Sequence, residues 1–133
     1  MVSVVQSNNK VTVAGHAGYA NKGCDIVCAA ISILVYNLEA SVLKLTNDVA
    51  DFKYTDEGVF IEFCSMSETS KILLNSFIIG IDELANNYPD YIELKINWAG
   101  VELFKSYGLV KHYDLKIWRK KWNTNKLKLQ KTF

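Results

Sequence analysis

Residues 15–30 read Gly-His-Ala-Gly-Tyr-Ala-Asn-Lys-Gly-Cys-Asp-Ile-Val-Cys-Ala-Ala, and this stretch joins two different structural patterns. An alternating apolar run precedes it, and a long apolar run with helical spacing follows it. The glycines within it permit backbone angles that other residues disfavour, so residues 15–24 are expected to form a loop. The stretch therefore predicts a strand, a loop and a helix in succession.

The elements on either side of this loop follow from their spacing. Residues 2–6 and 10–14 alternate weakly and are separated by turn residues, which predicts a β-hairpin. A helix is expected from Asp25 to about residue 45, with the Asp25 side chain accepting hydrogen bonds from two backbone N–H groups, those of Val27 and Cys28. Six apolar residues are expected on the buried side of this helix, namely Ile26, Ala30, Ile33, Leu34, Leu38 and Val42.

The second half of the domain repeats the pattern. Residues 51–55 and 59–64 predict a second hairpin around an Asp-Glu-Gly turn. A second helix is expected to begin at Ser65 or Ser67 and to end near residue 87, and residues 91–96 predict a last strand. The order β-β-α-β-β-α-β predicts an α+β domain, with a mixed or antiparallel sheet and two helices packed on it.

The charge of the chain divides near residue 97. Residues 1–97 hold six lysines against twelve acidic residues, a net charge of −6, whereas residues 98–133 hold nine basic residues against two acidic ones, a net charge of +7. The split predicts a domain over 1–97 and a basic C-terminal extension over 98–133. Tryptophans lie among lysines at 116–122, a composition typical of RNA contact.

Composition restricts the cellular context. Half of the residues are hydrophobic, yet no uninterrupted apolar run reaches the roughly 18 residues of a membrane span, and no export signal is recognised at the N-terminus. Three cysteines, an odd number, favour free thiols in a reducing cytoplasm. Cysteine and histidine spacings match no zinc site, so neither a metal nor another cofactor is expected.

A thiol and an imidazole lie at the two ends of the loop. Cys28 is expected in the first turn of its helix, where the helix dipole favours an anion such as a thiolate and where backbone amides could hold an oxyanion. His16 is expected at the end of the preceding strand. Covalent cysteine catalysis needs a nucleophile and a base, and the two residues can supply them. The alternative is that both are structural, Cys28 as a small helix residue and His16 as a strand end.

Two neighbouring residues have more than one interpretation. Asp25 could orient His16 as the third member of a triad, or could only cap the helix. Ser32, one turn after Cys28, could donate to a substrate or serve helix packing. Cys24 is a rival nucleophile, but it precedes the helix and gains less from the dipole.

The loop itself is a candidate lid. Gly18 and Gly23 could act as its hinges, with Tyr19 helping to form an apolar groove for a substrate. The alternative is that the two glycines only make a tight connection. The third cysteine, Cys64, is expected to be a strand residue without a chemical role.

The block at 15–20, followed by Gly23, the run 25–30 and Ser32, resembles the signature of the ribosomal-processing cysteine protease family, Prp. The resemblance continues through residues 56–58 and 88–91 and covers about residues 2–97. It implies a cytoplasmic, homodimeric bacterial protease with a Cys28–His16 dyad and with a loop, here residues 17–24, that closes over the substrate.

The resemblance also implies a substrate class. This is the N-terminal extension of a large-subunit ribosomal protein, with a pattern like Leu-Asn-Leu-Gln-Phe-Phe-Ala, or a similar extension on phage capsid and scaffold proteins. The basic extension lies outside the resemblance and supports a competing hypothesis, a non-catalytic ribosome- or RNA-associated binding module. The sequence leaves open the choice between a ribosomal and a phage substrate, and the role and fold of residues 98–133.

Overall fold

Seven helices and strands follow one another in the computed structural model, which describes residues 1–96. Their order is the predicted β-β-α-β-β-α-β. Residues 98–133, with the expected basic extension and its RNA contact, lie outside the described residues. The elements are β1 (Val2–Ser7), β2 (Lys10–Ala14), α1 (Ile26–Leu45), β3 (Ala50–Thr55), β4 (Gly58–Phe63), α2 (Glu68–Asn87) and β5 (Ile92–Ile96).

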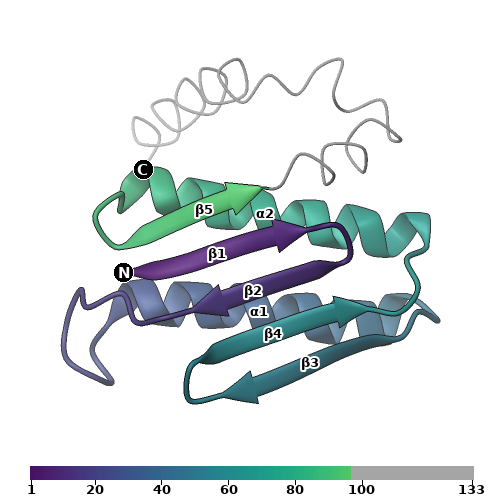
Figure 1. The fold of residues 1–133 in the computed structure, drawn as a ribbon, viewed down its shortest axis with the longest axis horizontal. Helices are drawn as coiled ribbons and strands as arrows, with labels where there is room; N and C mark the ends of the chain where they lie inside the picture. Colours follow the sequence, from purple (N-terminus) through teal and green to yellow (C-terminus); the bar gives the residue numbers. More distant parts are fainter. Residues whose placement is uncertain (97–133) are drawn as a thin grey trace, which may run out of the picture. The chain divides into compact units, whose positions relative to one another are not determined.

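The five strands form one mixed sheet in the order β3-β4-β2-β1-β5. Three neighbouring pairs are antiparallel, and β1 and β5 are parallel, with Val2 opposite Ile92. Both helices lie on the same face of the sheet, behind it in Figure 1, and they pack against each other. The α+β class, the mixed sheet and the two packed helices are therefore confirmed.

Both helix starts carry the side-chain caps that their sequences predict. Asp25 is the N-cap of α1, and its side chain accepts from the backbone N–H groups of Val27 and Cys28. Ser67, one of the two serines considered, is the N-cap of α2 and accepts from the N–H of Ser70. These caps satisfy donors that have no partner within the helix, so they determine where each helix begins.

The buried side of α1 differs from the expected one. Ile26 and Ile33, both predicted to be buried, are 54% and 62% exposed. The prediction is confirmed for Leu38 and Val42 but wrong for Ile26 and Ile33, because α1 is apolar on almost every side and its spacing alone does not determine which side meets the sheet. The buried residues of α1 are Val27, Ile31, Val35, Leu38 and Val42.

Helix α1 also meets, by length and composition, the requirement for a membrane span, contrary to the expectation from uninterrupted runs. The few polar residues within it do not lower its mean hydropathy enough to exclude it. The core helix of a two-layer domain meets the same requirement, and the buried side of α1 packs within this domain.

The turn between β3 and β4 brings the backbone of Gly58 against β2. Gly58 has a φ of +151°, and a Cβ atom placed on it would lie 2.1 Å from the carbonyl oxygen of Val13. Gly58 pairs with Ala14 at the end of β2, immediately before the loop that carries His16. The absence of a side chain at this position therefore allows the two strands to approach.

Replacing Gly58 with alanine is expected to lower the free energy of unfolding by about 2 kcal/mol or more, because it adds a backbone clash to a strained φ. Urea denaturation measures the change. Gly23→Ala is the matched control, because Gly23 also has a positive φ of +88° but has nothing within 4 Å of the added Cβ. Equal losses in the two variants would contradict the proposed clash.

Candidate active site

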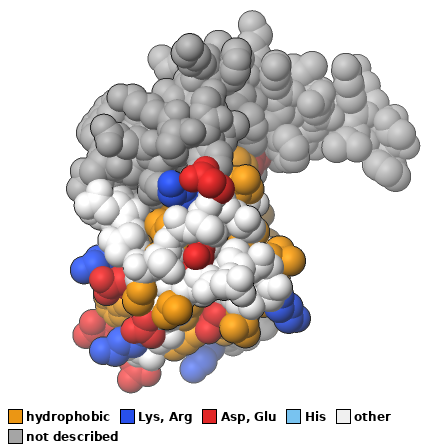
Figure 2. Space-filling view, turned by 90° about the vertical axis from the view of Figure 1, so that its right-hand side faces the viewer, with side chains coloured by type: hydrophobic (Ala, Val, Ile, Leu, Met, Phe, Trp, Pro, Cys, Tyr) orange, Lys and Arg blue, Asp and Glu red, His pale blue; other side chains and the backbone are white. Residues whose placement is uncertain are grey.

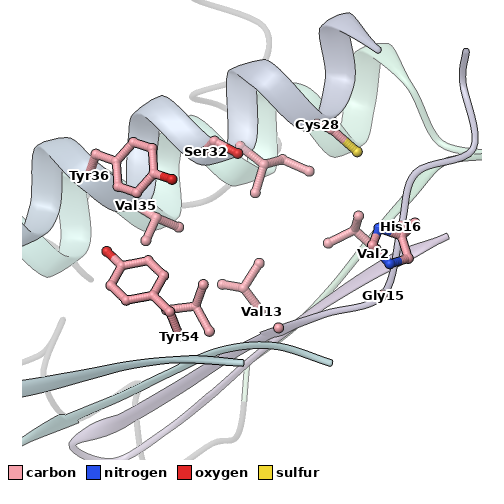
Figure 3. A pocket seen from close by; sticks show the side chains of 12 residues that line it. Val2, Val13, Gly15, His16, Cys28, Ser32, Val35, Tyr36 and Tyr54 are labelled. Carbon is pink, nitrogen blue, oxygen red and sulfur yellow. The ribbon is translucent and has the colours of Figure 1, made fainter. Parts of the chain in front are cut away.

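A cavity of about 200 Å³ lies between α1 and the sheet. Figure 3 shows α1 on one side of it and the strands on the other, with the sulfur of Cys28 and the ring of His16 at one end. The interior is mainly apolar. The lining residues are Val2, Val13, Gly15, His16, Cys28, Ile31, Ser32, Val35, Tyr36, Tyr54, Gly58 and Val59.

His16 reaches the cavity because β2 ends just before it. Gly15 turns the chain with a φ of +93°, and a Cβ atom there would lie 2.5 Å from the carbonyl oxygen of Met1. The Met1 nitrogen donates to the backbone oxygen of His16 at 2.8 Å. The start of β1 thus holds the His16 backbone at the mouth of the cavity.

Cys28 reaches the same cavity from the first turn of α1. Its thiol is free and half-buried, and in Figure 3 it lies across the opening from His16. Within residues 1–96 no hydrogen bond joins the two side chains. Cys24 and Cys64 are also free, but both are exposed and neither lines the cavity. Cys28 is therefore the cysteine that the fold brings together with a histidine.

Asp25 connects the loop to the helix. Its Oδ1 accepts from the N–H groups of Val27 at 3.0 Å and Cys28 at 2.9 Å, and its Oδ2 accepts from those of Tyr19 at 3.0 Å and Ala20 at 3.3 Å. These hydrogen bonds, led by that from Cys28, hold the pKa of Asp25 below its ordinary value. The carboxylate is therefore ionised at neutral pH and keeps both parts in place.

These contacts bear on two earlier expectations. Among the described residues, His16 donates no hydrogen bond to Asp25, so the capping role is the one that the structure bears out. The amides of Val27 and Cys28, expected to hold an oxyanion, already donate to Asp25. In this state they are not free for that purpose, because a donated N–H has little capacity for a second acceptor.

The loop is held at its other side by an aromatic cluster. The Tyr19 ring meets Tyr88 and Tyr91 edge to face, with ring centroids 5.6 and 5.2 Å apart. Gly18 and Gly23 have positive φ values of +68° and +88°, as hinge positions permit. None of Gly18, Tyr19 and Gly23 lines the cavity, so Tyr19 does not form part of its wall in this conformation.

Two tyrosines that line the far end of the cavity, and a glutamate that accepts a hydrogen bond from one of them, were not foreseen from the sequence. The hydroxyl of Tyr54 donates to Glu39, and the rings of Tyr54 and Tyr36 lie 6.0 Å apart. Burial, and then the bond to Glu39, raises the pKa of Tyr54. Tyr36 stands eight residues after Cys28, on the same flank of α1, which is the spacing that could have revealed it. Tyr54 has no such local signal.

The described residues 1–96 contain no candidate metal site. Among the described residues, no group of three or more His, Cys, Asp or Glu side chains is placed to hold a metal ion.

Comparison with known proteins agrees with this arrangement. A family model, described as cysteine protease Prp, matches residues 1–93. This chain belongs to the cysteine protease Prp family. Similar relatives named ribosomal processing cysteine protease Prp include one from Mycoplasma pneumoniae, 32% identical over 71% of this chain and 94% of the relative, and one from Staphylococcus aureus, 26% identical over 68% and 91%.

Solved structures show the same Prp fold. One is Prp from S. aureus in complex with a covalently linked product peptide, with a TM-score of 0.66 and 21% identity over 72% of this chain and 97% of that one. Another is a protein from Streptococcus mutans, with a TM-score of 0.56 and 28% identity over 71% and 90%. The likeness to the first, at 21% identity, is a likeness of fold.

Removing one ring of the aromatic cluster is expected to loosen the loop. An edge-to-face pair contributes about 0.5–1.5 kcal/mol, so Tyr88→Ala or Tyr91→Ala should raise the rate of tryptic cleavage after Lys22 by roughly two- to tenfold. Mass spectrometry of early digestion products measures that rate. Tyr36→Ala is the control, because it also removes a tyrosine ring that packs against another tyrosine, but Tyr36 has no ring contact with the loop. Unchanged cleavage in both cluster variants would contradict the proposed restraint.

Proposed function

We propose that this protein is a cysteine endopeptidase that removes a short N-terminal extension from a ribosomal protein, or a similar extension from a phage structural protein. The observation that carries the proposal is the placement of Cys28 and His16 on facing elements at the mouth of one cavity. The names of the relatives and the peptide bound to S. aureus Prp support the same activity.

In the proposed reaction Cys28 attacks the scissile carbonyl carbon, and its thiol proton passes to His16. The C–N bond breaks as His16 gives that proton to the leaving amine, and water then hydrolyses the thioester. The loop would have to move first, since the first-turn amides that could hold the oxyanion are engaged by Asp25. Release of the Asp25 contacts would make these donors available.

The shape and lining of the cavity suit an apolar peptide. Its sheet side presents Val2, Val13 and Val59, and its helix side adds Ile31 and Val35. Burying leucine and phenylalanine side chains on such a surface is favourable by roughly 1.5–3 kcal/mol for each. A leucine or phenylalanine side chain from an extension of the Leu-Asn-Leu-Gln-Phe-Phe-Ala type is therefore a suitable occupant of this cavity.

Incubation with a peptide that carries this segment tests the activity directly. Mass spectrometry is expected to find cleavage within or directly after the Phe-Phe-Ala part with the unchanged chain and none with Cys28→Ala. Peptides with the two phenylalanines replaced by serine serve as the substrate control. Cleavage of the first peptide by Cys28→Ala at the same rate would exclude Cys28 as the nucleophile.

The reactivity of the three thiols separates a protease from a binding module. Exposure alone predicts that Cys24 and Cys64 react before the half-buried Cys28. A catalytic dyad instead predicts that iodoacetamide modifies Cys28 fastest at neutral pH, and that His16→Ala slows only this reaction. Peptide mapping after short exposure measures all three rates. An order that follows exposure would favour the non-catalytic module.

The RNA contact of that alternative stays a prediction for residues 98–133. On the face shown in Figure 2, basic, acidic and hydrophobic side chains of the described residues are interspersed. No patch of one charge forms among them on this face, so the described part of this face offers no electrostatic support for RNA binding.

We also propose that the protein acts as a homodimer in the cytoplasm. Its three free thiols suit a reducing compartment. Three large apolar residues of α1, Ile26, Ile33 and Leu43, are 54%, 62% and 78% exposed. A second copy of this helix, with the same apolar side, is the partner that such a stripe fits.

A charge placed in this stripe is expected to separate the two copies. Leu43→Glu should shift the protein from dimer to monomer, with a dissociation constant roughly tenfold or more higher, since a buried charge at an interface costs at least about 1.4 kcal/mol. Sedimentation velocity over a range of concentrations measures the shift. Ile72→Glu is the control, since Ile72 is 53% exposed but lies on α2. A monomeric unchanged protein would exclude the dimer.

A further inference from the structure

Three side chains with polar heads line the cavity from one flank of α1. Cys28, Ser32 and Tyr36 follow one another at intervals of four residues, and all three contribute to the cavity wall. In Figure 3 they form a row along the helix, from the thiol at one end to the Tyr36 ring at the other. The cavity therefore has a polar edge that begins at the candidate nucleophile.

The interval of this row matches the repeat of an extended peptide. Four residues of α-helix rise about 6 Å. Two residues of an extended strand rise about 6.6 Å, and backbone groups that point to the same side recur at that distance. A strand lying beside α1 could therefore place every second peptide group opposite a member of the row. With the scissile carbonyl at Cys28, Ser32 would face the peptide two residues away and Tyr36 the peptide about four residues away.

The sheet side of the cavity suits the side chains of the same strand. Val2, Val13 and Val59 come from β1, β2 and β4 and give it an apolar surface. Alternate side chains of an extended peptide would rest on this surface, while its backbone N–H and C=O groups would point at right angles to the side chains. Hydrogen bonds to those groups would come from polar side chains that flank the strand, which on the α1 side are the members of the row.

Tyr36 and Tyr54 differ in what their hydroxyls can do. The Tyr54 hydroxyl donates to Glu39, so it ties β3 to α1. The Tyr36 hydroxyl has no hydrogen-bond partner among residues 1–96, and Figure 3 shows it directed toward the Ser32 end of the cavity. The two rings lie side by side, 6.0 Å apart. Tyr36 therefore presents a free hydroxyl to the cavity, and Tyr54 does not.

We propose that the Tyr36 hydroxyl binds the backbone of the substrate about four residues from the scissile bond. This inference rests on the proposed protease function and adds a length requirement to it. A peptide too short to reach Tyr36 loses one hydrogen bond, whatever its side chains. Ser32 makes the corresponding contact two residues from the scissile bond.

A truncation series on the cleaved peptide tests the length requirement. Residues are removed one at a time from each end, and kcat/KM is measured with the unchanged chain and with Tyr36→Phe. On one side of the scissile bond, loss of the residue about four positions away should lower kcat/KM of the unchanged chain by roughly three- to tenfold. Tyr36→Phe should cleave the full peptide at the reduced rate and show no further step at that length.

A substrate with an ester in place of the amide at that position tests the same contact by changing a single peptide group. The ester lacks the N–H and has a weaker carbonyl acceptor, so it should reduce cleavage by the unchanged chain and leave Tyr36→Phe unaffected. Tyr54→Phe is the matched control, since it removes a hydroxyl from a neighbouring ring but should keep the step in the truncation series. The proposal would be overturned if Tyr36→Phe still showed the drop in kcat/KM at that peptide length, or if it lowered kcat/KM equally for all peptides.

Binding to an inactive chain separates this proposal from the protease function. The affinity of Cys28→Ala for the full and the truncated peptides is measured by calorimetry, with and without Tyr36→Phe. A three- to tenfold loss of affinity with Tyr36→Phe on the full peptide alone supports the contact even where no cleavage is found. Absence of both cleavage by the unchanged chain and binding by Cys28→Ala would overturn the protease function and this contact with it.

Discussion

One carboxylate, that of Asp25, joins the two parts of the chain on which the candidate site depends. One of its oxygens holds the amides at the start of α1, and the other holds the loop amides of Tyr19 and Ala20. Asp25 is thus a common acceptor for the loop and for the helix amides, and its withdrawal from the helix would free donors beside Cys28.

Three sides of helix α1 have different surroundings and different roles. One side, with Val27 and Ile31 among its residues, packs in the core, and a second carries Cys28 and the hydroxyls toward the cavity. The third exposes Ile26 and Ile33. A helix with these duties is apolar almost all round, which explains why it also has the composition of a membrane span. The same property explains why its rotation could not be predicted from spacing.

Local chemistry made most of the fold predictable. Caps at Asp25 and Ser67 and the turn at Gly58 are signals that act within a few residues, and the helices and strands begin and end close to where these signals predict. The pairing of β1 with β5 and the buried side of α1 depend on contacts between distant segments. A short window of sequence does not encode such contacts. The class of fold and the two helices on the sheet were therefore predictable, whereas the β1–β5 pairing and the buried side of α1 were not.

The candidate site was likewise predictable only in part. His16 and Cys28 are joined by one strand, loop and helix, so their meeting at one cavity could be expected from that stretch alone. Tyr54 lines the cavity from β3, which is distant from the loop in the sequence. The ring of Tyr19 packs against Tyr88, which is also distant from it in the sequence. The groups that would perform the chemistry are thus local. The groups that restrain the loop and bound the far end of the cavity come from the tertiary fold, because only the packed sheet and helices bring them within reach.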